Sequence, residues 1–257
     1  MVTGLEKFRK HFAGLEDCFV LIGGAASDIW MGKSGLDFRM TKDLDLVLIV
    51  EALRSEFFQR FWAFVKNGKY GSLQQGDERP EFYRFKEPNV EEYPFMIELL
   101  SRNKLDLPEG VHLTPIPVDE DISSLSAILL NDVYYAYVVE TKQSVDGIQI
   151  VPAQCLIPLK ARAYLDLVKR RDDGDNRVRS VDIKKHRYDV FRIYRTLAPA
   201  ARHKLPNLPK TDLAQFLDTL PEESEEWTSI RKAVGAADLP DTSEILSQMT
   251  DIFELHR

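Results

Sequence analysis

The sequence has little cysteine and no long hydrophobic run, and each shortage excludes a class of protein. Its two cysteines, Cys18 and Cys155, lie far apart in apolar segments, which fits buried free thiols better than a disulfide framework or a paired-cysteine metal site. The longest apolar runs, FVLI and LVLIV, are too short to cross a bilayer, and MVTGLEKFRKHF lacks the apolar core of a signal peptide. These features predict a cytoplasmic protein that does not enter the membrane.

The chain also lacks the composition of disordered and fibrous proteins. It has no long tract rich in Pro, Ser or Gly and no visible repeat, and 44% of its 257 residues are hydrophobic while 29% are charged. This balance predicts a globular protein with enough apolar side chains for one large core or two modest ones.

Charge of either sign is not scarce, but it is unevenly distributed. The formal net charge is −7, yet the stretch from Cys155 to Lys204 holds 14 Lys and Arg against 6 Asp and Glu, a local net charge of +8. Such a stretch is a candidate surface for a polyanion, and solvated helix faces are the alternative explanation.

The hydrophobic pattern changes character near Pro152. Before it, expected strands alternate with expected helices; after it, only helical periodicity remains. The fold class predicted is therefore α/β (α+β), with a mixed sheet and flanking helices in residues 1–152 and an all-helical part in residues 153–257. The expected strands are 18–22, 44–50, 81–86, 94–100, 133–141 and 148–151, and the expected helices are 5–14, a segment from Ala25 to about Gly32, 51–65, 156–171, 180–197, 211–219, 222–234 and 242–255.

Two carboxylates stand at the start of the strand in TKDLDLVLIV, residues 41–50. In a strand, Asp43 and Asp45 point to the same face, roughly 6.5 to 7 Å apart along the backbone. Like charges this close repel unless a cation screens them, and Mg²⁺ favours paired carboxylates together with substrate phosphates. The pattern therefore suggests a metal site, and an exposed strand start with unrelated acids remains the alternative.

A pair of glycines, Gly23 and Gly24, ends the preceding strand in FVLIGGAASDIW. A strand that turns directly into a helix presents free backbone N–H groups and the positive end of the helix dipole, which together suit a phosphate. Glycine permits close approach of the ligand because it has no side chain. A tight turn without a ligand would explain the same pair.

A third acid, Glu98, lies in the apolar strand FMIELL. Burying an unpaired carboxylate there would cost several kcal/mol, and two-metal phosphoryl chemistry normally uses three carboxylates. Glu98 is therefore a candidate third ligand or base. The alternatives are a glutamate at a strand edge and an ion-pair partner for Arg102.

These motifs in this order resemble the nucleotidyltransferase superfold, typified by DNA polymerase beta and the antibiotic nucleotidyltransferases. The segments LIPLKARAYLDLVKRR and DIKKHRYDVFRIYRTL resemble the lysine-bearing helix and the K-x-x-x-D helix of AbiEii-type toxin nucleotidyltransferases from bacterial abortive-infection and toxin–antitoxin systems. The resemblance covers residues 18–197 approximately.

The resemblance implies an enzyme that moves NMP from an NTP, with Mg²⁺ or Mn²⁺, to a hydroxyl of RNA, such as a tRNA end, or of a protein. It also implies that an antitoxin could be a partner. Asp43, Asp45 and Glu98 would be the catalytic and metal-binding acids. The nucleotide would be bound by Gly23, Gly24, Ser27, Lys160, Lys185 and Asp189.

The chain departs from the family pattern at two positions. Ala25 replaces the usual serine, with Ser27 two positions further on, and His186 stands where an acidic residue is frequent. A non-catalytic nucleotide- or protein-binding module on the same fold is therefore an alternative, and a kinase of the same superfold is another. Lys185 and Asp189 would also fit an ordinary helix pair, and Lys160 would fit a half-buried lysine that reaches solvent.

The catalytic hypothesis depends on one geometric condition. Glu98 must lie on the same side of the sheet as Asp43 and Asp45, because a carboxylate on the opposite side could not meet the same cations.

Overall fold

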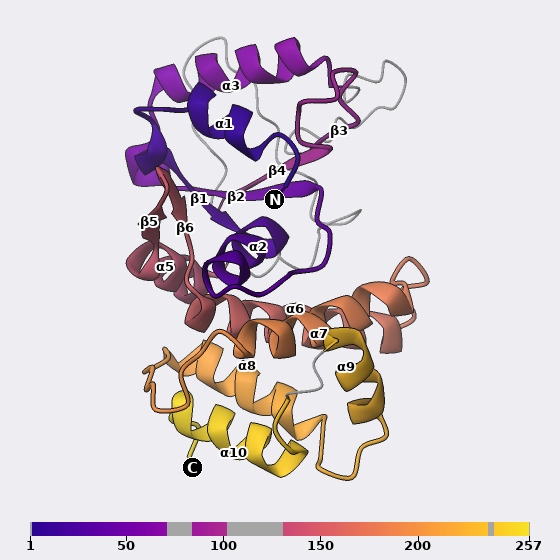
Figure 1. The fold of residues 1–257 in the computed structure, drawn as a ribbon. Helices are drawn as coiled ribbons and strands as arrows, with labels where there is room; N and C mark the ends of the chain where they lie inside the picture. The colour runs from indigo at the N-terminus through magenta and orange to yellow at the C-terminus, as the bar shows by residue number, and fades with distance from the viewer. Residues whose placement is uncertain (1, 71–83, 102–130, 236–238, 257) are drawn as a thin grey trace. The chain divides into compact units, whose positions relative to one another are not determined.

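The computed structural model describes residues 2–70, 84–101, 131–235 and 239–256, and Figure 1 shows its elements. The chain divides into two compact units, Met1–Pro152 and Ala153–Arg257. The described part of the first unit combines a six-stranded sheet with helices, and that of the second is helical. The predicted fold class, a mixed sheet with flanking helices followed by an all-helical part, is confirmed.

The sheet of the α/β unit is mixed, with strand order β3-β4-β2-β1-β6-β5. The central pair, β1 with β2, is antiparallel, whereas β2–β4 and β1–β6 are parallel. The edge pairs β3–β4 and β5–β6 are antiparallel. The bounds are β1 Phe19–Ile22, β2 Asp43–Leu48, β3 Arg84–Lys86, β4 Met96–Leu100, β5 Gln143–Val145 and β6 Ile148–Ile150.

One face of this sheet is covered by the aromatic helices α1 (Leu5–His11) and α3 (Ser55–Gly68). Figure 1 shows both helices on one side of the sheet and α2 (Gly23–Lys33) on the other. The rings that pack between α1, α3 and the sheet are Phe8, Phe12, Phe19, Phe57, Phe61, Phe64 and Phe85. The opposite face of the strands is also largely apolar, with Val20, Ile22, Val47 and Leu100 buried there, and it carries its acids toward one end.

The boundaries of most elements agree with the expectations from sequence. Helix α3 begins a few residues later than expected because a 3₁₀ turn, Val50–Ala52, precedes it. The expected strand 81–86 is described only at Arg84–Lys86, since residues 81–83 lie outside the described ranges. Cys18 and Cys155 are buried free thiols, as predicted.

The prediction of a strand at 133–141 is wrong, because residues Asp132–Thr141 form helix α5. The Asn131 side chain caps it by accepting hydrogen bonds from the backbone N–H groups of Val133, at 2.9 Å, and Tyr134, at 3.4 Å. Tyr134 and Val138, one turn apart, are buried. The Tyr and Val content suggested a strand, but β-propensity depends on packing, and here a helical cap and a buried helical face outweigh it.

The second unit contains α6 (Ala153–Asp172), α7 (Ser180–Tyr194), α8 (Asn207–Asp218), α9 (Glu226–Val234) and α10 (Thr242–Ile252). Helix α6 packs on α7 and α8, and α7 also packs on α9. These helices match the five expected after Pro152, each shifted by a few residues at its ends. None of the helices in the described ranges is long and apolar enough to span a membrane.

Candidate functional site

Three acids share one face of the α/β sheet. In the parallel register of β2 and β4, Asp45 pairs with Glu98 and Asp43 pairs with Met96. Residues directly opposite each other on neighbouring strands point to the same face. Asp43, Asp45 and Glu98 therefore lie on the face opposite the aromatic helices, which we call the acid face, and the geometric condition of the catalytic hypothesis is met.

The glycine pair lies against this face. Ile22, the last residue of β1, pairs with Asp45, so Gly23 emerges beside that carboxylate. Gly23 has a positive φ of 66°, and a Cβ added to it would lie 1.9 Å from Asp45 Oδ2. Any other residue at this position would collide with Asp45, so the sequence needs glycine here for both conformation and space.

Gly24 approaches a second pair of side chains that sequence reasoning did not identify. A Cβ at Gly24 would lie 2.5 Å from Thr41 Oγ1 and 3.7 Å from Arg39 Nη2. Arg39, Thr41, Asp43 and Asp45 are alternate residues of one segment, and three of them lie beside the two glycines. The same spacing of two that revealed the acids could have revealed Arg39 and Thr41.

The hydroxyl of Ser27, which the resemblance assigns to nucleotide binding, forms a hydrogen bond within α2. The N-cap residue, Ile22, has no polar side chain to cap the helix. The buried Ser27 hydroxyl donates to the carbonyl oxygen of Gly23 at 2.7 Å, within the helix itself. A contact between Ser27 and phosphate stays a prediction. The N–H groups of the first turn, which have no partner within the helix itself, are the feature that a phosphate would use.

The edge strand β3 adds positive charge to the acid face. Arg84 pairs with Glu98 and Lys86 pairs with Met96 in the antiparallel register of β3 and β4. Arg84 Nη2 lies 3.1 Å from Glu98 Oε1, and the two side chains are only 12% and 4% exposed. Glu98 thus has an arginine partner in Arg84, while Arg102, the partner considered from sequence, lies outside the described ranges.

The acid face can be compared with the requirements of a divalent cation. Two carboxylates beside a glycine turn at the start of a helix are donors that would suit Mg²⁺ shared with a phosphate ligand. Within the described ranges, however, no three His, Cys, Asp or Glu side chains are grouped closely enough to hold a metal ion. Asp43 and Asp45 are the residues that fit the ion, and Glu98 as a third ligand stays a prediction.

The candidates in the helical unit form a buried cluster. Lys160 on α6 bonds through Nζ to Asp189 Oδ2 on α7 at 3.2 Å, and both side chains are almost fully buried. Arg192 Nη1 bonds to the other oxygen of Asp189 at 2.9 Å. Lys185, one turn before Asp189, is half-buried. The structure therefore brings Lys160 and Asp189 together, and their binding of nucleotide stays a prediction.

The basic stretch is partly neutralised by acids of its own unit. Residues 153–257 contain 18 Lys and Arg against 17 Asp and Glu, a net of +1. Later helices contribute partners, since Arg162 bonds to Asp212 at 3.1 Å and Arg187 bonds to Glu226 at 2.5 Å. Hydrogen bonds from arginine, Arg177 first, also hold the pKa of Asp175 well below its usual range. The local +8 is thus not the charge of the whole unit.

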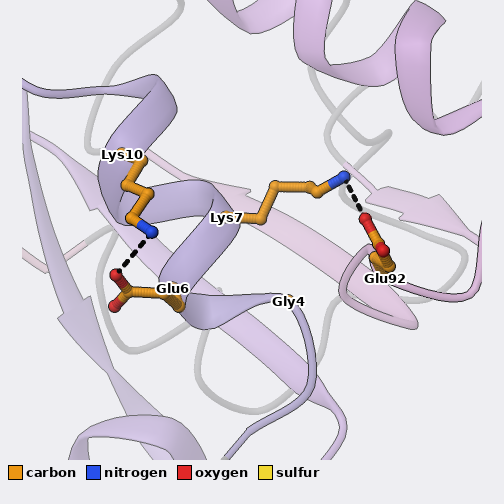
Figure 2. A pocket seen from close by; sticks show the side chains of 5 residues that line it. All are labelled: Gly4, Glu6, Lys7, Lys10 and Glu92. Carbon is orange, nitrogen blue, oxygen red and sulfur yellow. Dashed lines mark hydrogen bonds and ion pairs between the residues drawn. The ribbon is translucent and has the colours of Figure 1, made fainter.

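A hollow of about 420 Å³ beside α1 is lined by Gly4, Glu6, Lys7, Lys10 and Glu92, the residues labelled in Figure 2. Its ammonium groups have carboxylate partners, since Lys7 Nζ lies 2.6 Å from Glu92 Oε2 and Lys10 Nζ lies 3.3 Å from Glu6 Oε1. The hydrogen bond to Glu92 raises the pKa of Lys7. Paired charges of this kind on an open surface offer neither an acid nor a base for chemistry.

A second hollow, of about 500 Å³, lies between α1, α2 and the β5–β6 hairpin. Its walls mix apolar residues, such as Ile29 and Ile148, with charged residues of both signs. Arg9, on its rim, donates to the carbonyl oxygen of Asp146 and pairs with Glu6. The residues of the acid face do not line this hollow, so it is separate from the candidate site.

Searches against protein-family models, curated proteins and solved structures found no match for this chain. The features of the chain that bear on function are therefore its local motifs and the geometry of the acid face.

Proposed function

We propose that the protein is a Mg²⁺-dependent nucleotidyltransferase that moves NMP from an NTP to a hydroxyl of an acceptor. One observation carries the proposal: the strand register aligns Asp43 and Asp45 on one face, with Asp45 against Gly23 at the start of α2. Carboxylates beside a phosphate cradle are the arrangement that phosphoryl chemistry requires.

The residues of the chain would divide the work of positioning. The N–H groups of Gly23 and Gly24 would receive phosphate oxygens, and Arg39 and Thr41, which adjoin Gly24, would flank them. Asp43 and Asp45 would hold Mg²⁺ or Mn²⁺, and the bound ion supplies charge neutralisation at the reacting phosphate. The acceptor oxygen forms a bond to the α-phosphorus, its proton is taken by a base, and pyrophosphate leaves.

Glu98 is the candidate for that base or for a third metal ligand. It lies beside Asp45 in the register, but its carboxylate bonds to Arg84. For either role, the bond to Arg84 must weaken when substrate enters.

RNA is the first acceptor class to test, and a protein hydroxyl is the second. The stretch from Cys155 to Lys204 provides a local excess of positive charge for a polyanion, although the helical unit as a whole is close to neutral. Toxin activity and an antitoxin partner, which the AbiEii resemblance implies, belong to the same proposal.

The test is to incubate the full chain with labelled NTPs, Mg²⁺ or Mn²⁺, and either cellular RNA or cellular protein. Wild type should label RNA, and Asp43→Asn or Asp45→Asn should reduce the rate roughly a hundredfold or more, because the variants lose charge where the metal binds. Asp132→Asn, an exposed acid at the start of α5, is the matched control and should keep the wild-type rate. If wild type and Asp43→Asn alike leave RNA and protein unlabelled, the proposal fails.

A non-catalytic nucleotide-binding module is the second candidate function. The bond between Arg84 and Glu98 favours it, because a third acid committed to an arginine is not available for chemistry. Ala25 favours it as well, since it replaces the hydroxyl usual in the family. Tight nucleotide binding that needs no divalent cation and leads to no turnover would decide for this candidate.

A further inference from the structure

The orientation of β3 is set by its middle residue. Phe85 is buried and contacts the rings of Phe61 and Trp62 on α3. Since neighbouring residues of a strand point to opposite faces, Arg84 and Lys86 must lie on the acid face. The packing of Phe85 in the apolar core therefore orients the side chains of Arg84 and Lys86 toward the acids.

Stability alone is a weak explanation for a buried ion pair such as Arg84–Glu98. Removing two charges from water costs several kcal/mol per ion, and apolar residues of similar size often serve stability equally well. A need for stability alone therefore does not explain why this position on an otherwise apolar strand carries a charged pair.

We propose that Arg84 is a phosphate-binding residue whose guanidinium is held by Glu98 until an anionic ligand takes the place of that carboxylate. The identity of the anion, the triphosphate of an NTP, rests on the proposed function. Guanidinium groups bind carboxylate and phosphate in the same fork geometry, so one can replace the other. The exchange frees Glu98 when the nucleotide is bound.

The place of Arg84 in the sheet supports this exchange. Across the strands, Arg84 pairs with Glu98, Glu98 pairs with Asp45, and Asp45 contacts Gly23. Two interstrand spacings, about 10 Å, separate the backbones of β3 and β2. A polyphosphate that lies across the acid face from the glycine pair would therefore run toward Arg84, and Lys86 would add positive charge on the same strand.

The proposal and its rival predict different effects for variants of Arg84 and Glu98. If Glu98 binds the Arg84 guanidinium only until an anion replaces it, Arg84→Gln weakens anion binding. Glu98→Gln, which releases Arg84, then strengthens anion binding. If Glu98 is a metal ligand from the start and Arg84 only neutralises it, the two variants change anion binding only through the charge of the site, and Arg84→Lys, which keeps that charge, binds as wild type does.

The experiment measures the affinity of the full chain for inorganic tripolyphosphate by calorimetry in metal-free buffer. Arg84→Gln should bind roughly tenfold to hundredfold more weakly, the loss expected for one charge-assisted hydrogen-bonded contact. Glu98→Gln should bind about threefold or more tightly, since it no longer competes for the guanidinium. Arg84→Lys should fall between wild type and Arg84→Gln, because it keeps the charge without the fork.

Arg54→Gln is the matched control. Arg54 also bonds to a carboxylate, Asp17, at 2.8 Å, but Asp17 precedes β1 while Gly23 follows its other end. This variant should bind tripolyphosphate as wild type does. A thermal melt of each variant checks its fold, and if Arg84→Gln does not fold, Arg84→Lys still decides because it keeps the charge and loses only the fork.

Unchanged affinity in Arg84→Gln or in Arg84→Lys, or unchanged or weaker affinity in Glu98→Gln, would overturn the inference. The outcome is separable from that of the proposed function. If tripolyphosphate binding depends on Arg84 but the protein transfers no nucleotide, the anion site is supported and the proposed enzymatic activity is contradicted. If Arg84→Gln transfers nucleotide with the wild-type rate and KM, the anion site at Arg84 is contradicted and the proposed enzymatic activity is supported.

Discussion

The two units place their charged side chains in different ways. The α/β unit lines them along one sheet face, where Asp43 and Asp45 are partly exposed beside the glycine pair. The helical unit instead buries one charged pair, Lys160 and Asp189, between α6 and α7. The first arrangement leaves carboxylates where a ligand can reach them, and the second removes them from water.

This difference shows which charged residues can be predicted from the sequence to lie close together. In a strand, a spacing of two puts side chains on one face, so Asp43 and Asp45 are neighbours by local geometry alone. In the helical unit the partners are distant in sequence, with 29 positions between Lys160 and Asp189 and 39 between Arg187 and Glu226. Their pairing depends on how the helices pack, and periodicity gives no information on that.

The largest expected effect tests whether the charges of the helical unit are structural. Asp189→Asn should lower the free energy of unfolding by about 3 to 5 kcal/mol, because it leaves the buried Lys160 and the nearby Arg192 without their carboxylate. Urea denaturation monitored by circular dichroism measures this change.

Asp182→Asn on the same helix is the control. Asp182 bonds to Arg179 on the surface at 2.8 Å, and such pairs contribute about 0 to 1 kcal/mol. Equal losses of stability in the two variants would mean that the buried pair of Asp189 contributes no more than the exposed pair of Asp182.

A smaller effect is expected where the α/β unit depends on glycine. Gly23→Ala should cost about 1 to 3 kcal/mol, since alanine is strained at a φ of 66° and its Cβ would meet Asp45. The displaced carboxylate should also abolish any activity of the acid face. The same melting and labelling experiments measure both losses.

Gly32→Ala is the matched control on the same helix. No atom lies within 4 Å of a Cβ at Gly32, and alanine in a helix interior is favoured over glycine by about 1 kcal/mol. This variant should be slightly more stable than wild type. A loss of stability in both variants would show that α2, and not the contact with Asp45, is responsible.

The sequence predicts most of the fold because the strong signals are periodic. The alternation in DLDLVL fixes both β2 and the face of its acids. Gly23 follows from its place at a strand end. These features depend on local geometry, which a sequence contains.

The parts that the sequence did not predict depend on tertiary contacts. Helix α5 has the composition of a strand, and only its cap and its packing select the helix. The partner of Glu98 could not be named, because Arg84 meets it only once β3 pairs with β4. Arg39 and Thr41 had the right spacing but lie outside the regular strand.

The cap of α5 gives the next test, in which a polar side chain of the α/β unit acts away from the acid face. Asn131→Ala should cost about 1 kcal/mol, because the N–H groups of Val133 and Tyr134 lose their acceptor. Asn131→Asp, which keeps a good capping oxygen, should stay within a few tenths of a kcal/mol of wild type. Equal losses in both variants would mean that the cap does not stabilise this helix.

The last test concerns a buried titratable group of the α/β unit that lies away from the acid face. Burial raises the pKa of the Cys18 thiol to about 11 from a usual value near 9. Between these values the unfolded chain loses the thiol proton and the folded chain keeps it, so stability falls as the pH rises from 9 to 11. Cys18→Ala lacks this titration, and its melting temperature should fall less than that of wild type over the same interval, whatever the offset between the two proteins at pH 7. If the melting temperatures of wild type and Cys18→Ala fall in parallel over this pH range, the thiol is not shielded from water, and the α/β unit has no buried titratable group at this position.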